Sequence, residues 1–328
     1  MNSTSSPTDR YLKVLEKHWG YTEFRGIQRD IIESIGAGRD TLGLMPTGGG
    51  KSITFQVPAM VLPGVCVVVT PLIALMKDQV AGLRKRHIRA AALHAGLGHE
   101  EILTILDNCV FGHYKFLYVS PERLSSEIFM AKFRHMEVSF VTIDEAHCIS
   151  QWGHDFRPAY LQIAELRKVK PDCPVLALTA TATPEVARDI QHVLRFRQEN
   201  VFRMSFYRPN LAYQVLWADF SLQSLRRVLE AENGSCIIYR RSRQQCEDLS
   251  KVLNQWGFTS TFFHAGLSHP EKDKRQTLWV QDKVRIMVAT SAFGMGIDKA
   301  DVRLVVHLDI PDSIEEYFQE AGRAGRDG

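Results

Sequence analysis

Short, uninterrupted apolar runs constrain the fold of this chain more than any other feature. They are rich in Val, Ile, Leu and Phe, and a longer stretch with helical spacing follows most of them. The runs are TLGLM (41–45), VCVVVTP (65–71), FLYVSPE (116–122), SFVTIDEAH (139–147), PVLALTATAT (174–183), CIIYRRS (236–242), TFFHAG (261–266), RIMVATSAF (285–293) and RLVVHLDIP (303–311). Continuous runs are typical of strands buried on both faces, and interleaved helices predict parallel α/β sheets with right-handed crossovers.

The length of the chain predicts two domains, because 328 residues exceed what one hydrophobic core usually organises. The segment 195–215, RFRQENVFRMSFYRPNLAYQV, has no clear period, and we interpret it as the connector. We expect a disordered tail over 1–10, a first domain over 11–205 and a second over 206–328. LHAGLGHEE (93–101) and FHAGLSHPE (263–271) each follow a strand-like run, so they indicate either a duplicated plan or a chance match.

Composition argues against a membrane-spanning, secreted or disulfide-linked protein. The chain is 45% apolar and 23% charged, as in ordinary soluble domains. No apolar run approaches the ~20 residues of a membrane span, and the start lacks a secretory signal. A net charge of +3 is too weak to indicate nucleic acid by itself. The six cysteines form no CxxC pair, so we expect neither zinc nor disulfides, and a reducing compartment fits.

The stretch MPTGGGKS (45–52) is typical of a phosphate-binding loop, since it lies between a predicted strand and a predicted helix. Glycines let backbone N–H groups approach phosphates, Lys51 supplies charge to the β- and γ-phosphates, and the Ser52 hydroxyl ligates Mg²⁺. The strict pattern has Gly where this chain has Met45, and the alternative is a glycine turn before a helix. We therefore expect ATP and Mg²⁺ to bind here.

ATP hydrolysis also needs an acid that holds Mg²⁺, a base that activates water and positive charge at the γ-phosphate, and other residues of the chain can supply them. Asp144 ends a predicted strand and can hold Mg²⁺, and Glu145 can position and deprotonate the attacking water. The alternative for such a pair is a solvated turn. Arg323 and Arg326 lie three apart in YFQEAGRAGRDG, on one helix face if that helix continues. They could stabilise charge at the γ-phosphate from the second domain, or they could be surface arginines.

Together these motifs resemble those of superfamily 2 helicases, which have two RecA-like domains with ATP between them. From about Tyr21 to Gly328 the chain resembles the RecQ family of DNA helicases, whose own form of the phosphate loop has Met at this position. FRGIQ (24–28) resembles the family's nucleotide-recognition motif, which implies that Gln28 reads the adenine edge between Tyr21 and Arg25. Further matches, in order, are VVVTPLIALMKDQV (67–80), LYVSPERL (117–124), LALTATAT (176–183), VATSAFGMGID (288–298), VVHLDIP (305–311) and QEAGRAGRDG (319–328).

The resemblance defines two sets of candidate residues. The nucleotide-binding set is Tyr21, Arg25, Gln28, Thr47, Gly48, Gly49, Gly50, Lys51 and Ser52. The catalytic set is Lys51, Asp144, Glu145, Gln319, Arg323 and Arg326, with Ser52 and Asp144 as the Mg²⁺ ligands.

CISQWGHDFRP (148–158) resembles the aromatic-rich loop of the RecQ family. Nucleic-acid bases stack on aromatic side chains for ~1–3 kcal/mol each without sequence readout. A loop joined directly to the acids can report this stacking to the attacking water. The expected coupling residues are His147, Trp152, His154, Phe156 and Arg157. The alternative is that Trp152 and Phe156 pack beneath a long loop.

The resemblance implies an ATP-dependent DNA helicase that moves 3′-to-5′ on single-stranded DNA and unwinds duplexes in repair and recombination. Its partner is DNA, no membrane is involved, and its place is the bacterial cytosol and nucleoid or a eukaryotic nucleus. Alternatives are an RNA helicase, or an ATP-gated DNA clamp that does not unwind. Arg240 and Arg241 stand where the family usually has smaller, less basic residues. They could add a phosphate contact, or they could be surface charge. The family continues into a final strand, a zinc-binding module and a winged helix, so we expect a fragment, and the alternative is a severely shortened protein.

Overall fold

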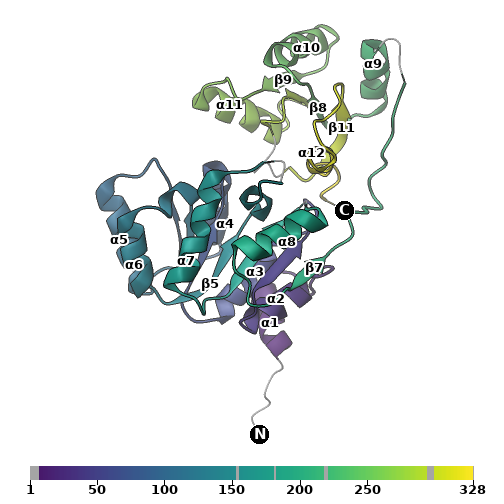
Figure 1. Ribbon diagram of the computed structural model, residues 1–328. Coiled ribbons are helices and arrows are strands. Elements are labelled where there is room, and N and C mark those ends of the chain that lie inside the picture. Colours follow the sequence, from purple (N-terminus) through teal and green to yellow (C-terminus); the bar gives the residue numbers. More distant parts are fainter. Residues whose placement is uncertain (1–6, 153–154, 181, 218–220, 294–298, 328) are drawn as a thin grey trace. The chain divides into compact units, whose positions relative to one another are not determined.

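The computed structural model describes residues 7–152, 155–180, 182–217, 221–293 and 299–327, and it divides into two compact units, Met1–Phe206 and Tyr207–Gly328 (Figure 1). Helix α1 (Pro7–Trp19) begins inside the segment expected to be a disordered tail. Proline suits the first turn of a helix because an N–H at this position would have no partner within the helix. No described helix is long and apolar enough to cross a lipid bilayer.

The first unit is built on a seven-stranded parallel sheet with the order β3-β4-β2-β5-β6-β1-β7. Its strands are β1 (Thr41–Leu44), β2 (Val65–Val69), β3 (Ala90–Leu93), β4 (Phe116–Val119), β5 (Val138–Ile143), β6 (Val175–Thr179) and β7 (Val201–Arg203). Alternate residues along β2 contribute to two separate cores, with Val67 and Val69 on one face and Cys66 and Val68 on the other. The sheet is therefore buried on both sides.

Helices cover both faces of this sheet. On one face, the core contains Ile31 from α2, Phe55 from α3 and Met76 from α4. On the other face, the core contains Leu106 from α5 and Phe133 from α6, and helices α7 and α8 also cover this face. The helices are α2 (Gln28–Gly36), α3 (Lys51–Val61), α4 (Ile73–Lys85), α5 (His99–Val110), α6 (Glu127–His135), α7 (Ile163–Val169) and α8 (Pro184–Val193), with short 3₁₀ helices η1 (Pro121–Arg123), η2 (Ala146–Ile149) and η3 (Pro158–Gln162).

The second unit contains a four-stranded parallel sheet with the order β11-β8-β10-β9. Its elements are β8 (Ser235–Tyr239), β9 (Ser260–Phe263), β10 (Ile286–Ala289), β11 (Val302–His307), α9 (Ser221–Ala231), α10 (Arg243–Gln255), α11 (His269–Val280) and α12 (Ile314–Ala321). Trp279 and Phe293 pack on one face of the sheet, and Leu229 and Leu253 pack on the other.

Both sheets confirm the predicted fold class, since every apolar run named above contains a strand. β3 has the sequence AAAL, in which alanine carries little strand preference, and it corresponds to the strand-like run expected before residues 93–101. One strand was not expected from the sequence. β7 lies inside the segment interpreted as connector and pairs with β1, so the first unit extends through this segment to Phe206.

Candidate active site

The phosphate loop joins the end of β1 to the first residue of α3. Gly48 and Gly50 adopt φ angles of 82° and 73°, in the left-handed region that favours glycine. Met45 is fully buried and packs in the core beside Ile31 and Phe55. The side chain at this position points into the core, which explains why the loop accommodates Met where the strict pattern has Gly.

Lys51 and Glu145 meet at the carboxyl edge of the sheet. β1 and β5 are parallel and separated only by β6, so residues that follow them emerge at the same edge. Lys51 Nζ lies 3.4 Å from Glu145 Oε1, and both side chains are largely buried. Glu145 has a left-handed φ of 50°, and its N–H donates to Asp144 Oδ1 at 3.0 Å. The structure therefore brings the predicted lysine and both acids together.

The surroundings of Asp144 fit a divalent cation. Burial, followed by the negative charge of Glu145, raises the pKa of the Asp144 carboxyl to about 6, and Lys51 opposes this shift. A buried carboxylate that needs positive charge, with the Ser52 hydroxyl in the first turn of α3, offers the oxygen ligands that Mg²⁺ prefers. The residues present thus fit the Mg²⁺ site that the sequence predicts.

Gln28 connects the predicted adenine-recognition segment to the phosphate loop. Its Nε2 donates to Gly49 O and Gly50 O, both at 3.2 Å, and its Oε1 accepts from Arg25 N at 2.9 Å. The Arg25 guanidinium lies 5.6 Å from the centre of the Tyr21 ring. The structure therefore brings these three residues together, and adenine recognition by Gln28 would replace bonds that its amide now makes.

His147 lies behind the acids and not at the surface. It belongs to η2 and is buried, and its Nδ1 is 2.8 Å from Thr179 Oγ1 at the end of β6. The same nitrogen is 3.5 Å from Glu145 Oε2. His147 thus links Glu145 to the end of a neighbouring strand, where it can transmit a displacement but not contact DNA directly.

The aromatic-rich loop exposes Trp152, one of the two aromatic side chains for which the sequence analysis predicts stacking. Trp152 is 81% exposed and Phe156 is partly buried, so Trp152 does not pack beneath the loop. Arg157 Nη2 lies 2.9 Å from Asp155 Oδ2, and Arg157 N donates to Cys148 O at 2.8 Å. The predicted coupling residue His154 lies outside the described residues.

Arg323 and Arg326 were expected to share one helix face only if the helix continued, and it does not. Helix α12 ends at Ala321, and Gly325, with a left-handed φ of 56°, lies in the turn that follows. Arg323 is only 5% exposed, which excludes a plain surface arginine. Burial raises the pKa of Tyr239 to about 12, and the positive charge of Arg323 nearby opposes this shift.

The remaining candidates of the second unit lie near the carboxyl edge of its sheet or in α12. Gln319 belongs to α12 and is partly buried. Arg240 and Arg241 follow β8 and pair with acids that follow β11, at 3.3 Å to Asp309 and 2.7 Å to Asp312. These contacts join two strand ends, as expected for local surface charge.

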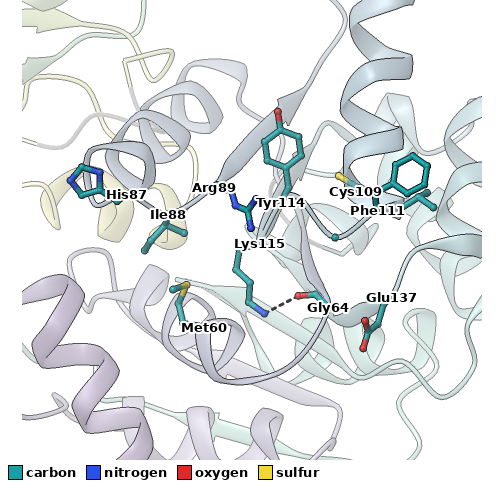
Figure 2. A pocket seen from close by; sticks show the side chains of 12 residues that line it. Met60, Gly64, His87, Ile88, Arg89, Cys109, Phe111, Tyr114, Lys115 and Glu137 are labelled. Carbon is teal, nitrogen blue, oxygen red and sulfur yellow. Dashed lines mark hydrogen bonds between the residues drawn. The ribbon is translucent and has the colours of Figure 1, made fainter.

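A cavity of about 470 Å³ opens at the other, amino-terminal edge of the first sheet (Figure 2). Several of its lining residues directly precede strands, among them Gly64, Arg89, Lys115 and Glu137. Lys115 Nζ donates to Gly64 O at 2.8 Å across it. No candidate site residue lines this cavity, so it is separate from the phosphate loop.

Comparison with known protein families matches both units. Residues 25–190 match the DEAD/DEAH box helicase family, and residues 221–328 match the helicase conserved C-terminal domain. The chain is 43% identical over 317 residues to the ATP-dependent DNA helicase RecQ of Pasteurella multocida, covering 96% of this chain and 50% of that protein. It is 41% identical to the probable ATP-dependent DNA helicase RecS of Bacillus subtilis, covering 96% and 64%.

A solved structure shares the fold at low sequence identity. The Mycobacterium smegmatis helicase Lhr, bound to ssDNA and AMP-PNP, superposes with a TM-score of 0.72 at 20% identity, covering 98% of this chain and 46% of that one. The chain spans about half the length of the RecQ proteins that it matches. It therefore belongs to the DEAD/DEAH box helicases and is a RecQ-family helicase core with two RecA-like domains.

Proposed function

We propose that this chain is the motor of an ATP-dependent DNA helicase. The observation that carries the proposal is the approach of Lys51 Nζ to Glu145 at 3.4 Å beside a left-handed glycine loop. A lysine and a carboxylate this close at one sheet edge support roles in binding phosphate and activating water, as phosphoryl transfer to water requires. Relatives that carry the name ATP-dependent DNA helicase support DNA as the nucleic acid.

Each candidate residue has a separate role in this proposal. Thr47, Gly48, Gly49 and Gly50 surround the phosphates, and Lys51 neutralises the charge that develops on the transferred group. Glu145 accepts a proton from the attacking water. When bound through Ser52 and Asp144, Mg²⁺ would neutralise phosphate charge. Tyr21 and Arg25 flank the adenine, and Gln28 contacts its edge.

The second unit would complete the site with positive charge. In this proposal Arg323, Arg326 and Gln319 act on the γ-phosphate of the bound ATP. Arginines supplied in this way contribute ~10³–10⁵ in rate in known phosphoryl-transfer systems. Closure around ATP and opening after hydrolysis would then alternate the grip on one DNA strand. We expect movement to be 3′-to-5′, with unwinding in repair or recombination.

Substitution of the two central residues tests the assignment. Lys51→Ala should lower ATP turnover about 10²–10³-fold or more, since a transition-state charge contact is lost. Glu145→Gln should lower turnover similarly but keep nucleotide affinity, because it removes the base and not the phosphate contact. ATPase rates and nucleotide titrations separate the two effects. Full turnover in Lys51→Ala would exclude this active site.

Replacement of the exposed tryptophan tests the coupling to DNA. Trp152→Ala should retain basal ATPase and lose most of the stimulation by single-stranded DNA, because the stacking signal no longer reaches Glu145. DNA affinity should fall less, since phosphate contacts supply most of it. Phe111→Ala is the control, because Phe111 is also exposed, at 74%, but lies at the amino-terminal edge of the sheet.

The melting temperature separates coupling from packing. Trp152 is exposed, so Trp152→Ala should melt like the unchanged chain. A Trp152→Ala protein that melts far lower and loses basal and stimulated activity in proportion would contradict a coupling role. Stimulation by RNA as strong as by DNA would favour an RNA helicase, and ATPase without strand separation would favour a DNA clamp.

A further inference from the structure

Three groups that bind metals meet beneath the aromatic-rich loop. His147, Cys148 and Asp155 each present one ligand atom, and these atoms all lie within 4.8 Å of one another. Cys148 Sγ is 3.7 Å from His147 Nε2 and 3.7 Å from Asp155 Oδ2. The thiol can donate its single proton to the carboxylate, and its sulfur can accept from the imidazole. A cation in the place of that proton could contact all three.

The two separations from Cys148 Sγ are close to those around a tetrahedral cation. With Zn–S near 2.3 Å and Zn–N or Zn–O near 2.0 Å, tetrahedral zinc separates sulfur from its neighbouring ligands by about 3.5 Å. The two observed separations of 3.7 Å need only a small contraction to reach this value. Thiolate, imidazole and carboxylate are also the three ligand types that zinc uses in proteins.

The orientation of His147 supports a metal at its Nε2. Its Nδ1 lies 2.8 Å from Thr179 Oγ1 and 3.5 Å from Glu145 Oε2, so the proton belongs on Nδ1 when Nε2 binds a metal. Metal-bound histidines usually donate their other N–H to an oxygen in this way, which fixes the ring and strengthens the ligand. The oxygen atoms that would accept the Nδ1 proton of a metal-bound His147 are therefore already in place.

We propose that His147, Cys148 and Asp155 form a binding site for Zn²⁺ or a similarly soft divalent cation. Binding replaces the thiol proton, which leaves to solvent, and forms bonds from the metal to sulfur, nitrogen and a carboxylate oxygen. A thiolate and a carboxylate neutralise the two charges of the ion. His147 and Cys148 are buried, but the Asp155 side chain is 34% exposed, so water can reach the fourth position.

Metal binding would change the loop that the proposed function assigns to DNA sensing. Asp155 now pairs with Arg157 at 2.9 Å, and a metal would compete for the same carboxylate. It would also tie Asp155 to η2, directly after the catalytic Glu145. We expect bound Zn²⁺ to hold the loop in one position and to lower DNA-stimulated ATPase, a consequence that rests on the proposed function.

The binding itself can be tested without activity. Co²⁺ is titrated into the full chain, and absorption from thiolate-to-cobalt charge transfer is recorded and then displaced with Zn²⁺. We expect one cobalt per chain with this absorption. Cys148→Ser should abolish it, and Asp155→Asn should weaken cobalt binding at least about 10-fold. Cys109→Ala is the matched control, because Cys109 is an equally buried thiol of the same core outside the cluster.

Each result decides the proposal. No thiolate absorption at saturating Co²⁺, or absorption that persists in Cys148→Ser, would overturn it, as would an unchanged affinity in Asp155→Asn. Asp155→Asn changes a partly exposed side chain, so it stays informative if Cys148→Ser does not fold. A chain without ATPase would refute the proposed function, while the cobalt titration would still decide the metal site.

Discussion

At the scale of single residues, Gly50 shows how an absent side chain shapes the phosphate loop. Its φ is 73°, and a Cβ there would lie 2.4 Å from Gln28 Nε2. Gly38 has a similar φ of 77°, but a Cβ there would meet no atom within 4 Å. The two glycines therefore share a left-handed backbone conformation and differ in contact, which makes them a matched pair.

We predict that Gly50→Ala weakens nucleotide binding severely, since alanine displaces Gln28 from the loop. Gly38→Ala should cost only the left-handed conformation, about 1–2 kcal/mol of stability, and leave nucleotide binding intact. Nucleotide titration and thermal melts of both variants measure the difference. Equal losses of nucleotide affinity would show that strain, and not the contact with Gln28, controls the loop.

Asp40 organises the opposite edge of the first sheet. Its carboxylate accepts two hydrogen bonds from Arg167 at 3.0 Å, one from Val175 N at 3.0 Å, and two from Arg197 at 3.0 Å. Burial alone would raise its pKa, but these bonds, those from Arg197 first, outweigh it and leave the Asp40 pKa below the usual value. The folded state thus favours the ionised carboxylate.

Asp40→Asn should therefore destabilise the chain in a pH-dependent way. A lowered folded-state pKa contributes stability above the unfolded value of 3.8, and this contribution disappears as the pH falls through the folded-state pKa. Breaking a buried pair costs about 3–5 kcal/mol, so urea unfolding should show a large deficit at pH 7 that shrinks below about pH 4. Glu185→Gln, in an exposed pair with Arg188, is the control. A deficit independent of pH would refute the charge argument.

Some residues of the candidate site could be predicted from the sequence, but the contacts between distant segments could not. Lys51 could be predicted because it ends a recognisable phosphate loop, and Asp144 and Glu145 because they directly follow a strand. The bonds from Gln28 to the phosphate loop could not, because they join segments that only the fold brings together. Cys148 and Asp155 are separated by a loop, so their spacing resembles no metal motif.

At the scale of elements, the two sheets repeat one plan. The order β3-β4-β2-β5 of the first sheet corresponds to β9-β10-β8-β11 of the second. The two HAGL sequences begin at the ends of β3 and β9, which occupy the same edge in this correspondence. The two HAGL sequences thus lie at equivalent positions of the two sheets. A match of four residues could not establish this by itself.

The ends of elements were harder to predict than the elements. Continuous Val and Ile runs identify buried strands because both faces need apolar side chains. The end of α12 before Arg323 depends on the turn around Gly325, which packs beside Arg208 and Asn210. Since these residues are remote in the sequence, the sequence alone left open whether the helix continues.

The correspondence of the sheets leads to a prediction for β11. Its counterpart β5 has a strand on each side, whereas β11 pairs only with β8 among the described strands. An open edge exposes backbone groups to water, so amides of β11 should exchange hydrogen faster than those of β5. Peptide-resolved hydrogen exchange measures this, with the central strand β8 as the control. Equal protection of β5 and β11 would contradict it, and fast exchange in β8 would indicate that the whole unit opens.

At the scale of the whole molecule, large apolar side chains gather at the start of the second unit. The exposed residues are Tyr207, Tyr213, Val215, Leu216 and Trp217. Trp217 is 97% exposed, and Val215 and Leu216 beside it are also uncovered. Single exposed apolar residues are common, but several within one short segment favour association with another apolar surface.

We predict that the chain self-associates as its concentration rises, because this surface loses water on contact with a second copy. Burying a Val or a larger apolar side chain contributes about 1.5–3 kcal/mol, so a double substitution of Val215→Ser and Trp217→Ser should weaken association about 10-fold or more without lowering the melting temperature. Phe111→Ser, at an exposed site of the first unit, controls for loss of apolar surface in general. Sedimentation velocity over a range of concentrations measures the effect. A chain that stays monomeric throughout, or a double variant that associates as strongly as the unchanged chain, would show that segment 207–217 does not drive association.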